Sequence, residues 1–220
     1  MKDDPIPQRK VKDDPPFLVK VCGITNAEDA RICADCGVSG LGFNFFPESS
    51  RFVTPEAAAH VIAGLPSGIL VYGVVVLGRD GSELWSEIGD LLDGIQVHGA
   101  QSEEDLRRFG DRRLLVAVSP VEAGRFSHFP LIIDTSWGTG QLACWEEVAR
   151  LDRPFVLSGG LRPENVGEAI QKLQPIGVDV CSGVERSPGR KDPDRVARFM
   201  EVVRGTGRLS DEPSGGGAAR

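Results

Sequence analysis

Eight short apolar runs recur along this chain, and segments with the apolar spacing of a helix separate them. The runs are rich in Val, Ile and Leu and do not alternate strictly with polar residues, which is typical of strands buried on both faces of a parallel sheet. They occupy residues 17–22, 40–45, 69–76, 94–98, 114–118, 131–134, 155–158 and 178–181. Eight strand–helix units predict a TIM (β/α)8 barrel, with a doubly wound open sheet as the alternative fold.

The helical segments begin with recognisable caps. Asn26, Thr54 followed by Pro55, and Ser102 each precede a helical pattern, as residues that cap or open helices do. The fifth unit is the weakest, because 122–127 is short for a helix and contains Gly124. We predict a single barrel domain over 17–204. Residues 1–16 and 205–220, which are Pro- or Gly-rich and lack periodicity, are expected to be flexible tails.

Composition excludes several classes of function. The 220 residues carry a net charge of −7, whereas a nucleic-acid-binding protein is expected to present a basic surface. No apolar stretch is long enough to span a membrane, and the charged N-terminal segment lacks the apolar core of a signal peptide, so we expect a cytoplasmic protein. Five cysteines without such a signal indicate reduced thiols. Cys33 and Cys36 have CxxC spacing but no second ligand pair, and we expect both in a helix core.

Two glycine-containing turns predict a phosphate site. Gly159-Gly160 follows the seventh apolar run and Ser182-Gly183 follows the eighth, and each turn is expected to open a helix. Glycine lets the backbone approach a ligand closely, and backbone amides at the start of a helix attract anions. In a barrel, the turns after strands 7 and 8 frequently bind phosphate. We therefore expect an enzyme that acts on a small phosphorylated molecule.

Four further residues stand at or just beyond the carboxyl ends of predicted strands, where barrel enzymes place their active sites. Cys22 suits a base or nucleophile, although buried cysteines are commonly inert. Asp134 closes an apolar run and suits an acid, with a capping role as the alternative. Arg51 suits bidentate capture of a carboxylate, unless it is a solvated surface residue. His98 either orients a substrate or is a hydrogen-bonded structural residue.

These residues lie in a series of motifs spread over roughly residues 17–204. The motifs are Val19-Lys20-Val21-Cys22-Gly23-Ile24-Thr25, Gly42-Phe43-Asn44-Phe45-Phe46-Pro47 with Ser49 and Arg51, Ile95-Gln96-Val97-His98-Gly99, Asp134, Gly138-Thr139-Gly140, Leu157-Ser158-Gly159-Gly160-Leu161 with Pro163-Glu164-Asn165-Val166, and Val178-Asp179-Val180-Cys181-Ser182-Gly183-Val184-Glu185 with Pro188-Gly189 and Lys191-Asp192. Taken together and in this order, they resemble the phosphoribosylanthranilate isomerase family of tryptophan biosynthesis.

The resemblance implies an Amadori rearrangement of N-(5-phosphoribosyl)anthranilate. The matching residues are then Asp134 as general acid, Cys22 as general base and Arg51 facing the anthranilate. His98 would contact substrate, and phosphate would bind the amides around Gly159, Gly160, Ser182 and Gly183. The resemblance implies no metal and no organic cofactor. It leaves a monomer or a homodimer as the expected assembly, with no nucleic-acid or membrane partner.

The chain also departs from the family pattern. The segment after Asp134 is short and carries Trp137 where the family has Gly, and Cys181 stands where Ser is usual. Val75 replaces a usual Phe. These differences leave open a paralogue acting on a related phosphorylated aminosugar. Another phosphate-binding barrel enzyme, such as a relative of indole-glycerol-phosphate synthase, is a further alternative, although Lys20 has no matching Glu. A barrel that only binds a phosphometabolite is the third.

Overall fold

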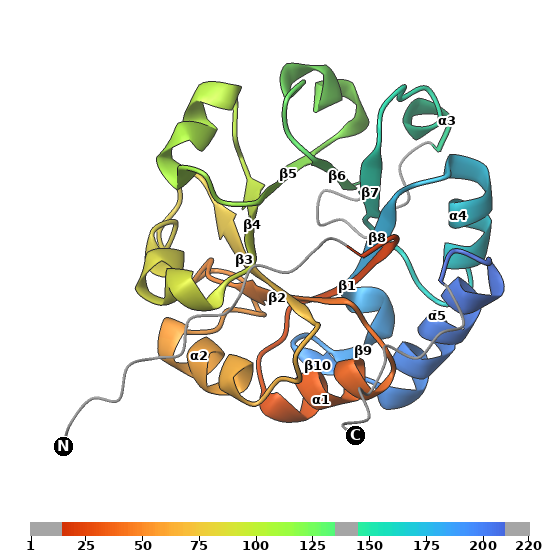
Figure 1. Cartoon of the computed structure of the whole chain (residues 1–220), viewed down its shortest axis with the longest axis horizontal. Coiled ribbons are helices and arrows are strands. Elements are labelled where there is room, and N and C mark those ends of the chain that lie inside the picture. Colours follow the sequence, from red (N-terminus) through yellow and green to blue (C-terminus); the bar gives the residue numbers. More distant parts are fainter. Residues whose placement is uncertain (1–14, 135–144, 210–220) are drawn as a thin grey trace, which may run out of the picture.

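The computed structural model describes residues 15–134 and 145–209. Eight parallel strands pair in sequence order, and β8 pairs with β1, so that the sheet closes into a barrel (Figure 1). The strands are β1 (Leu18–Cys22), β2 (Gly40–Asn44), β3 (Leu70–Val76), β4 (Gly94–His98), β5 (Leu114–Val118), β6 (Leu131–Asp134), β7 (Phe155–Ser158) and β8 (Gly177–Val180). The closed ring confirms the predicted TIM barrel and rules out the open sheet.

Helical segments surround the ring, as Figure 1 shows. The α-helices are α1 (Ala27–Asp35), α2 (Pro55–Ala63), α3 (Trp145–Val148), α4 (Val166–Leu173) and α5 (Pro193–Gly205). The helices after β3, β4 and β5 are 3₁₀ segments, namely η1 (Leu84–Leu91), η2 (Glu103–Phe109) and η3 (Pro120–Arg125). The fifth unit is thus short, as its sequence indicated. The Asn26 and Thr54 side chains accept hydrogen bonds from backbone amides of the first turns of α1 and α2, as predicted.

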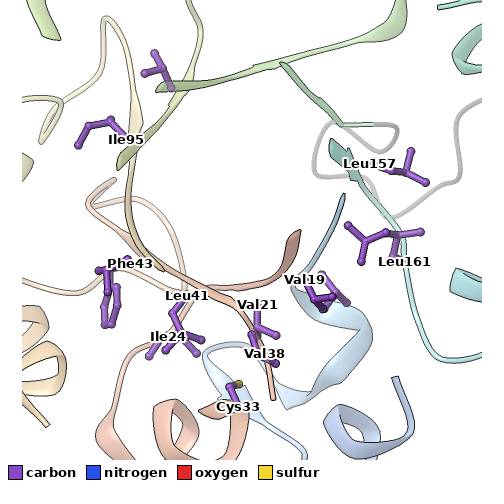
Figure 2. Packing of buried hydrophobic residues seen from close by; sticks show 14 of the residues in the cluster. Val19, Val21, Ile24, Cys33, Val38, Leu41, Phe43, Ile95, Leu157 and Leu161 are labelled. Atoms are coloured by element: carbon purple, nitrogen blue, oxygen red, sulfur yellow. The ribbon is translucent and has the colours of Figure 1, made fainter. Parts of the chain in front are cut away.

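Strand side chains divide between two cores. Outward-facing residues such as Val21 and Leu41 pack toward α1, where they meet Cys33 and Val38 (Figure 2). Inward-facing residues form a separate apolar cluster at the amino-terminal end of the strands. Its members are Leu18, Leu70, Tyr72, Leu115, Ala117, Ile132 and Val156. Because this cluster fills the base of the barrel, the polar inward-facing side chains gather at the opposite, carboxyl end of the strands.

The chain after β8 differs from the prediction. The second glycine turn leads into one turn of 3₁₀ helix, η4 (Ser182–Val184), and then into a hairpin of β9 (Glu185–Ser187) and β10 (Arg190–Lys191). Only α5, capped by Asp192, continues as an α-helix. The expectation that this turn opens a helix directly was therefore wrong. Gly189, with φ at +75°, allows the tight turn that connects β9 to β10.

Cys33 is buried in α1, as predicted, but Cys36 is the partly exposed C-cap of that helix and is not a core residue. The predicted tail 1–16 lies almost wholly outside the described residues, and so do 210–220 of the second tail, the segment with Trp137 and Gly138-Thr139-Gly140, and Cys144. Among the residues that are described, no helix is long and apolar enough to cross a membrane.

Candidate active site

A pocket of about 380 Å³ opens at the carboxyl ends of the strands. Every barrel strand except β5 contributes a described residue to its wall or to the turn beside it. The lining includes Cys22, Asn44, Ser49, Arg51, Val74, Gln96, His98, Asp134, Ser158, Gly159, Gly160, Leu161, Asp179, Cys181 and Ser182. The side chains predicted to act on substrate therefore face one common space, which is the geometric requirement for acid–base chemistry on one molecule.

Cys22 lies at the end of β1 and is 8 % exposed. Its thiol pairs with the thiol of Cys181, and this hydrogen bond, together with the nearby ammonium of Lys20, lowers the pKa of Cys22 to about 7 although burial opposes the shift. The same contact and burial raise the pKa of Cys181. The shifts assign Cys181 as the donor in this contact, and the same thiol also lies within reach of Glu185, with Sγ and Oε1 3.8 Å apart. A substantial fraction of Cys22 is thiolate near neutral pH. Gly23, with φ at +77°, turns the chain away immediately afterwards.

Lys20 and Asp179 form a buried ion pair below the two thiols. Lys20 Nζ lies 2.8 Å from Asp179 Oδ1, and Ser158 Oγ donates to Asp179 Oδ2 at 3.0 Å. Burial alone would lower the pKa of Lys20, but the carboxylate of Asp179 reverses the effect and raises it. Lys20 is therefore a fixed cation, and its field stabilises negative charge on Cys22.

Asp134 ends β6, which is three strands away from β1 around the ring. Near it, His98 Nε2 lies 2.8 Å from Gln96 Nε2. Burial lowers the pKa of His98 more than the carboxylate of Asp134 raises it, so that the imidazole is neutral at pH 7. The Gln96 Oε1 atom is buried and has no partner among the described residues, which leaves an acceptor beside the pocket.

The guanidinium of Arg51 forms an ion pair with the carboxylate of Glu185, at the start of β9. Its Nε lies 3.0 Å from Oε1, and its Nη2 lies 2.7 Å from Oε2. Lys191 Nζ donates to Glu185 Oε1 at 2.9 Å and to the Cys22 carbonyl at 2.6 Å. This bidentate contact is made with a carboxylate of the protein itself, which was not predicted. Since a guanidinium has five N–H donors, its Nη1–Nη2 edge can address a second carboxylate.

The two glycine turns meet at one edge of the pocket. Gly159 and Gly160 have φ of +89° and +64°, a backbone region that favours glycine. A β-carbon on Gly183 would lie 1.9 Å from the Leu161 carbonyl oxygen, so the turn after β8 packs directly on the turn after β7. Asn165 ties the first turn together, because it donates to the Gly160 carbonyl and accepts from the Arg162 amide. Pocket residues Gly160, Leu161 and Ser182 also line a neighbouring depression of about 510 Å³.

All but one of the residues predicted to act on substrate line this pocket, and Gly183 lies in the turn beside it. Sequence reasoning gave no role to Asp179, Ser158 or Gln96, and it did not foresee the Glu185 contact with Arg51. Period-two alternation was the available signal: Asp179 precedes Cys181 by two residues and Gln96 precedes His98 by two, so each shares an inward face. Within the described ranges, no three His, Cys, Asp or Glu side chains come together as a metal site.

A closed barrel with a thiol, an imidazole and a carboxyl group in a pocket at the carboxyl ends of its strands, beside a twin-glycine turn, has the arrangement of a barrel enzyme. Comparison of the chain with known protein families and proteins identifies its family within this class. The family model described as N-(5'-phosphoribosyl)anthranilate (PRA) isomerase matches residues 19–202. The N-(5'-phosphoribosyl)anthranilate isomerase of Syntrophus aciditrophicus is 37% identical over 201 residues, covering 84% of this chain and 86% of the relative.

Solved structures of similar proteins belong to the same family. The crystal structure of phosphoribosyl anthranilate isomerase from Thermotoga maritima has a TM-score of 0.78 at 33% identity, covering 86% of this chain and 99% of that one. A structure of such an isomerase in complex with reduced 1-(o-carboxyphenylamino)-1-deoxyribulose 5-phosphate has a TM-score of 0.73 at 33% identity, with the same coverage. The chain belongs to the phosphoribosylanthranilate isomerase family and is an isomerase of tryptophan biosynthesis.

Proposed function

We propose that this chain converts N-(5'-phosphoribosyl)anthranilate to 1-(2-carboxyphenylamino)-1-deoxyribulose 5-phosphate with Asp134 as general acid and Cys22 as general base. The single observation that carries the proposal is the placement of a thiol, its pKa lowered to about 7, and a carboxyl group on one pocket. A base whose pKa lies near the working pH combines a useful thiolate fraction with useful basicity. Strands β7 and β8 separate β6 from β1 on the shorter way round the ring, and a sugar is expected to fit between the two groups.

The pocket's polarity orients the substrate. Its phosphate binds the backbone amides around Gly159, Gly160, Ser182 and Gly183, where the turns after β7 and β8 meet. The anthranilate carboxylate takes the Nη1–Nη2 edge of Arg51, whose other edge Glu185 holds. His98, as a neutral imidazole, and the acceptor oxygen of Gln96 then face the sugar hydroxyls.

The reaction moves a hydrogen from C2 to C1 and a proton from the C2 hydroxyl to the former ring oxygen. Asp134 donates a proton to the ribose ring oxygen, the bond from that oxygen to C1 breaks, and a Schiff base forms between C1 and the anthranilate nitrogen. The Cys22 thiolate then removes the proton from C2, and the C2–H electrons form a C1–C2 double bond as the nitrogen becomes neutral. The resulting enol tautomerises to the ketone as C1 takes up one proton and the C2 hydroxyl releases one, and this exchange restores the Cys22 thiolate and the Asp134 acid. Lys20 stays charged throughout and favours the thiolate before each turnover.

Lys20 also bears on the competing synthase hypothesis. A synthase would need a lysine that can donate and accept protons at the pocket, together with a glutamate. Lys20 is fully buried, bonded to Asp179, and kept protonated by that carboxylate. This argues against the synthase hypothesis and supports the isomerase.

Two variants test the assignment. Cys22→Ala and Asp134→Asn each remove one proton-transfer group, and we expect each to lower kcat by about 10²- to 10⁴-fold with little change in KM. The assay is the loss of substrate fluorescence with purified protein, and growth of an isomerase-deficient tryptophan auxotroph is the second readout. Cys33→Ala, in the outer core, is the matched control. Near-normal turnover in either pocket variant contradicts the assignment, and parent protein that turns over only another aminosugar phosphate would favour the paralogue.

A further inference from the structure

Two thiols meet at the seam where the barrel closes. Strands β1 and β8 pair in parallel with Lys20 opposite Asp179 and Val21 opposite Val180. Cys22 and Cys181 each follow the last of these pairs by one residue, with Cys22 at the end of β1 and Cys181 just beyond β8. Lys20 and Asp179 point inward and bond to each other, so the residues two positions further along share their inward face. Chain topology therefore places the two sulfurs side by side at the pocket.

Other contacts locate the two sulfurs independently. A β-carbon on Gly23, the residue that follows Cys22, would lie 3.2 Å from Cys181 Sγ. The two thiols share a hydrogen bond, and both residues line the pocket of about 380 Å³. Both cysteines are free thiols. A small solute that enters the pocket thus reaches both sulfurs.

The backbone spacing suits a covalent bond between them. Neighbouring strands of a sheet lie about 4.8 Å apart. Disulfides join residues whose Cα atoms are about 4.4–6.8 Å apart. A bond between Cys22 and Cys181 therefore needs rotation of side chains but no separation of β1 from β8.

The pair is also chemically distinct from the other described cysteines. The thiolate is the reactive form of cysteine, and the lowered pKa of Cys22 provides it at neutral pH. Burial in α1 instead raises the pKa of Cys33 to about 12 and keeps that thiol protonated. Cys36 has a raised pKa as well, also through burial. Oxidation is thus expected to begin at Cys22.

We infer that Cys22 and Cys181 form a reversible dithiol–disulfide site, which a small hydroperoxide oxidises and which switches off the isomerase when it closes. The chemistry of disulfide formation rests only on the geometry of the two thiols. The loss of activity rests on the proposed function of Cys22 as general base, because a sulfur bonded to Cys181 cannot accept the C2 proton.

The oxidation proceeds in two balanced steps. The Cys22 thiolate attacks one oxygen of hydrogen peroxide, the O–O bond breaks, and hydroxide leaves and takes up the proton that the thiol had lost. Cys181 then attacks the sulfenic sulfur, and its proton leaves with the sulfenic hydroxyl as water. Two thiols have given two electrons and two protons to one peroxide, which becomes two waters. A dithiol reductant reverses the bond by thiol–disulfide exchange.

The test uses the full-length, fully reduced protein and hydrogen peroxide as the probe. After treatment, free thiols are alkylated, and digestion with mass spectrometry locates any cross-linked peptide. Isomerase activity is measured before peroxide, after it, and after dithiothreitol. We expect a Cys22–Cys181 cross-link, a mass lower by two hydrogen atoms, and a loss of activity on the order of 10²-fold or more, the contribution of a general base, which dithiothreitol restores.

Two variants sharpen the test, each compared with its own untreated sample. Cys181→Ser lacks the resolving thiol, so peroxide should add oxygen to Cys22, and dithiothreitol should no longer restore activity once that sulfur is overoxidised. Cys33→Ser keeps the pair and should behave as the parent does.

The inference is overturned if the parent loses activity without a Cys22–Cys181 cross-link, or if the cross-link joins another cysteine. At a large excess of peroxide, a loss of activity in Cys181→Ser that dithiothreitol still reverses as fully as in the parent overturns it as well. Failure of the proposed function looks different: reduced Cys22→Ala would then turn over normally, or cross-linked parent would remain active. In the latter case the disulfide forms but is not a switch.

Discussion

At the scale of single residues, the environment of Cys22 decides whether a thiol can serve as a base. Cysteine is ordinarily protonated at neutral pH, and burial makes the thiolate less favourable still. Hydrogen bonding from Cys181 and the charge on Lys20 reverse this and bring the pKa to about 7. A largely buried thiol is thereby given the pKa that its proposed role as a base requires.

This environment predicts a pH profile. Because the base must be deprotonated, Cys22 should give kcat/KM an acidic limb that falls as pH drops below about 7. Cys181→Ala removes the donor, so the midpoint of this acidic limb should move to higher pH. Cys181→Ser keeps a donor and should shift it less. Steady-state kinetics between pH 5.5 and 9 measures the midpoints, and an unmoved midpoint in Cys181→Ala would show that the thiol contact does not tune the base.

Arg51 gives a second prediction at this scale. Lysine keeps the positive charge but loses the planar fork that can hold Glu185 on one edge and the substrate carboxylate on the other. Arg51→Lys should therefore raise KM by about 10- to 100-fold, equivalent to one charge-assisted hydrogen bond of about 1.5–3 kcal/mol, while kcat changes much less. Exposed Arg186→Lys is the control. A kcat effect larger than the KM effect would place Arg51 in the chemical step instead.

At the scale of elements, the turns after β7 and β8 act as one unit. The amide-bearing turn at Gly183 packs against the Leu161 carbonyl so tightly that no side chain fits between them. The proposed phosphate site around Gly159, Gly160, Ser182 and Gly183 therefore depends on the separation of two loops, each held by its own strand. A change in one loop should alter phosphate affinity even where no phosphate-binding amide is removed.

Gly183→Ala tests this dependence. The added β-carbon must push the turn away from Leu161, and overpacking of this kind costs about 1–3 kcal/mol. We expect a lower Tm and a KM raised by about tenfold or more, which is a loss of about 1.4 kcal/mol in binding. Gly124→Ala, where a β-carbon meets nothing within 4 Å, is the matched control. A normal KM with a lowered Tm would mean that the proposed phosphate site tolerates the displacement.

The sequence predicts the strands of the barrel well, but it does not predict the hairpin that follows β8. The strands follow from apolar runs, because a buried parallel strand needs apolar residues on both faces. The hairpin of β9 and β10 could not be foreseen, since Glu185 and Lys191 read as surface residues until the fold buries them against Arg51 and the Cys22 carbonyl. Cys22, His98 and Asp134 were predicted as pocket residues because each stands at the carboxyl end of an apolar run. Asp179 and Gln96 were not singled out, because their partners lie on other strands or are themselves part of the pocket.

At the scale of the whole molecule, the closing seam between β1 and β8 joins the two ends of the domain. Lys20 and Asp179 are 159 residues apart in the chain and meet at 2.8 Å inside the barrel. Lys191 and Glu185 reach back in the same way, to the carbonyl of Cys22 and the side chain of Arg51. The C-terminal quarter of the chain therefore positions the groups that the N-terminal quarter contributes to the pocket.

The energetic coupling between β1 and β8 can be measured at the ion pair of Lys20 and Asp179. Removing one partner leaves an uncompensated buried charge, so Lys20→Met and Asp179→Asn should each lower the free energy of unfolding by about 3–5 kcal/mol. The double variant buries no lone charge, and its stability should exceed that of the weaker single variant. Urea denaturation of the four proteins gives the double-mutant cycle. If the two losses simply add, the pair does not hold the seam, and the barrel closes through backbone pairing and the apolar cluster at its base.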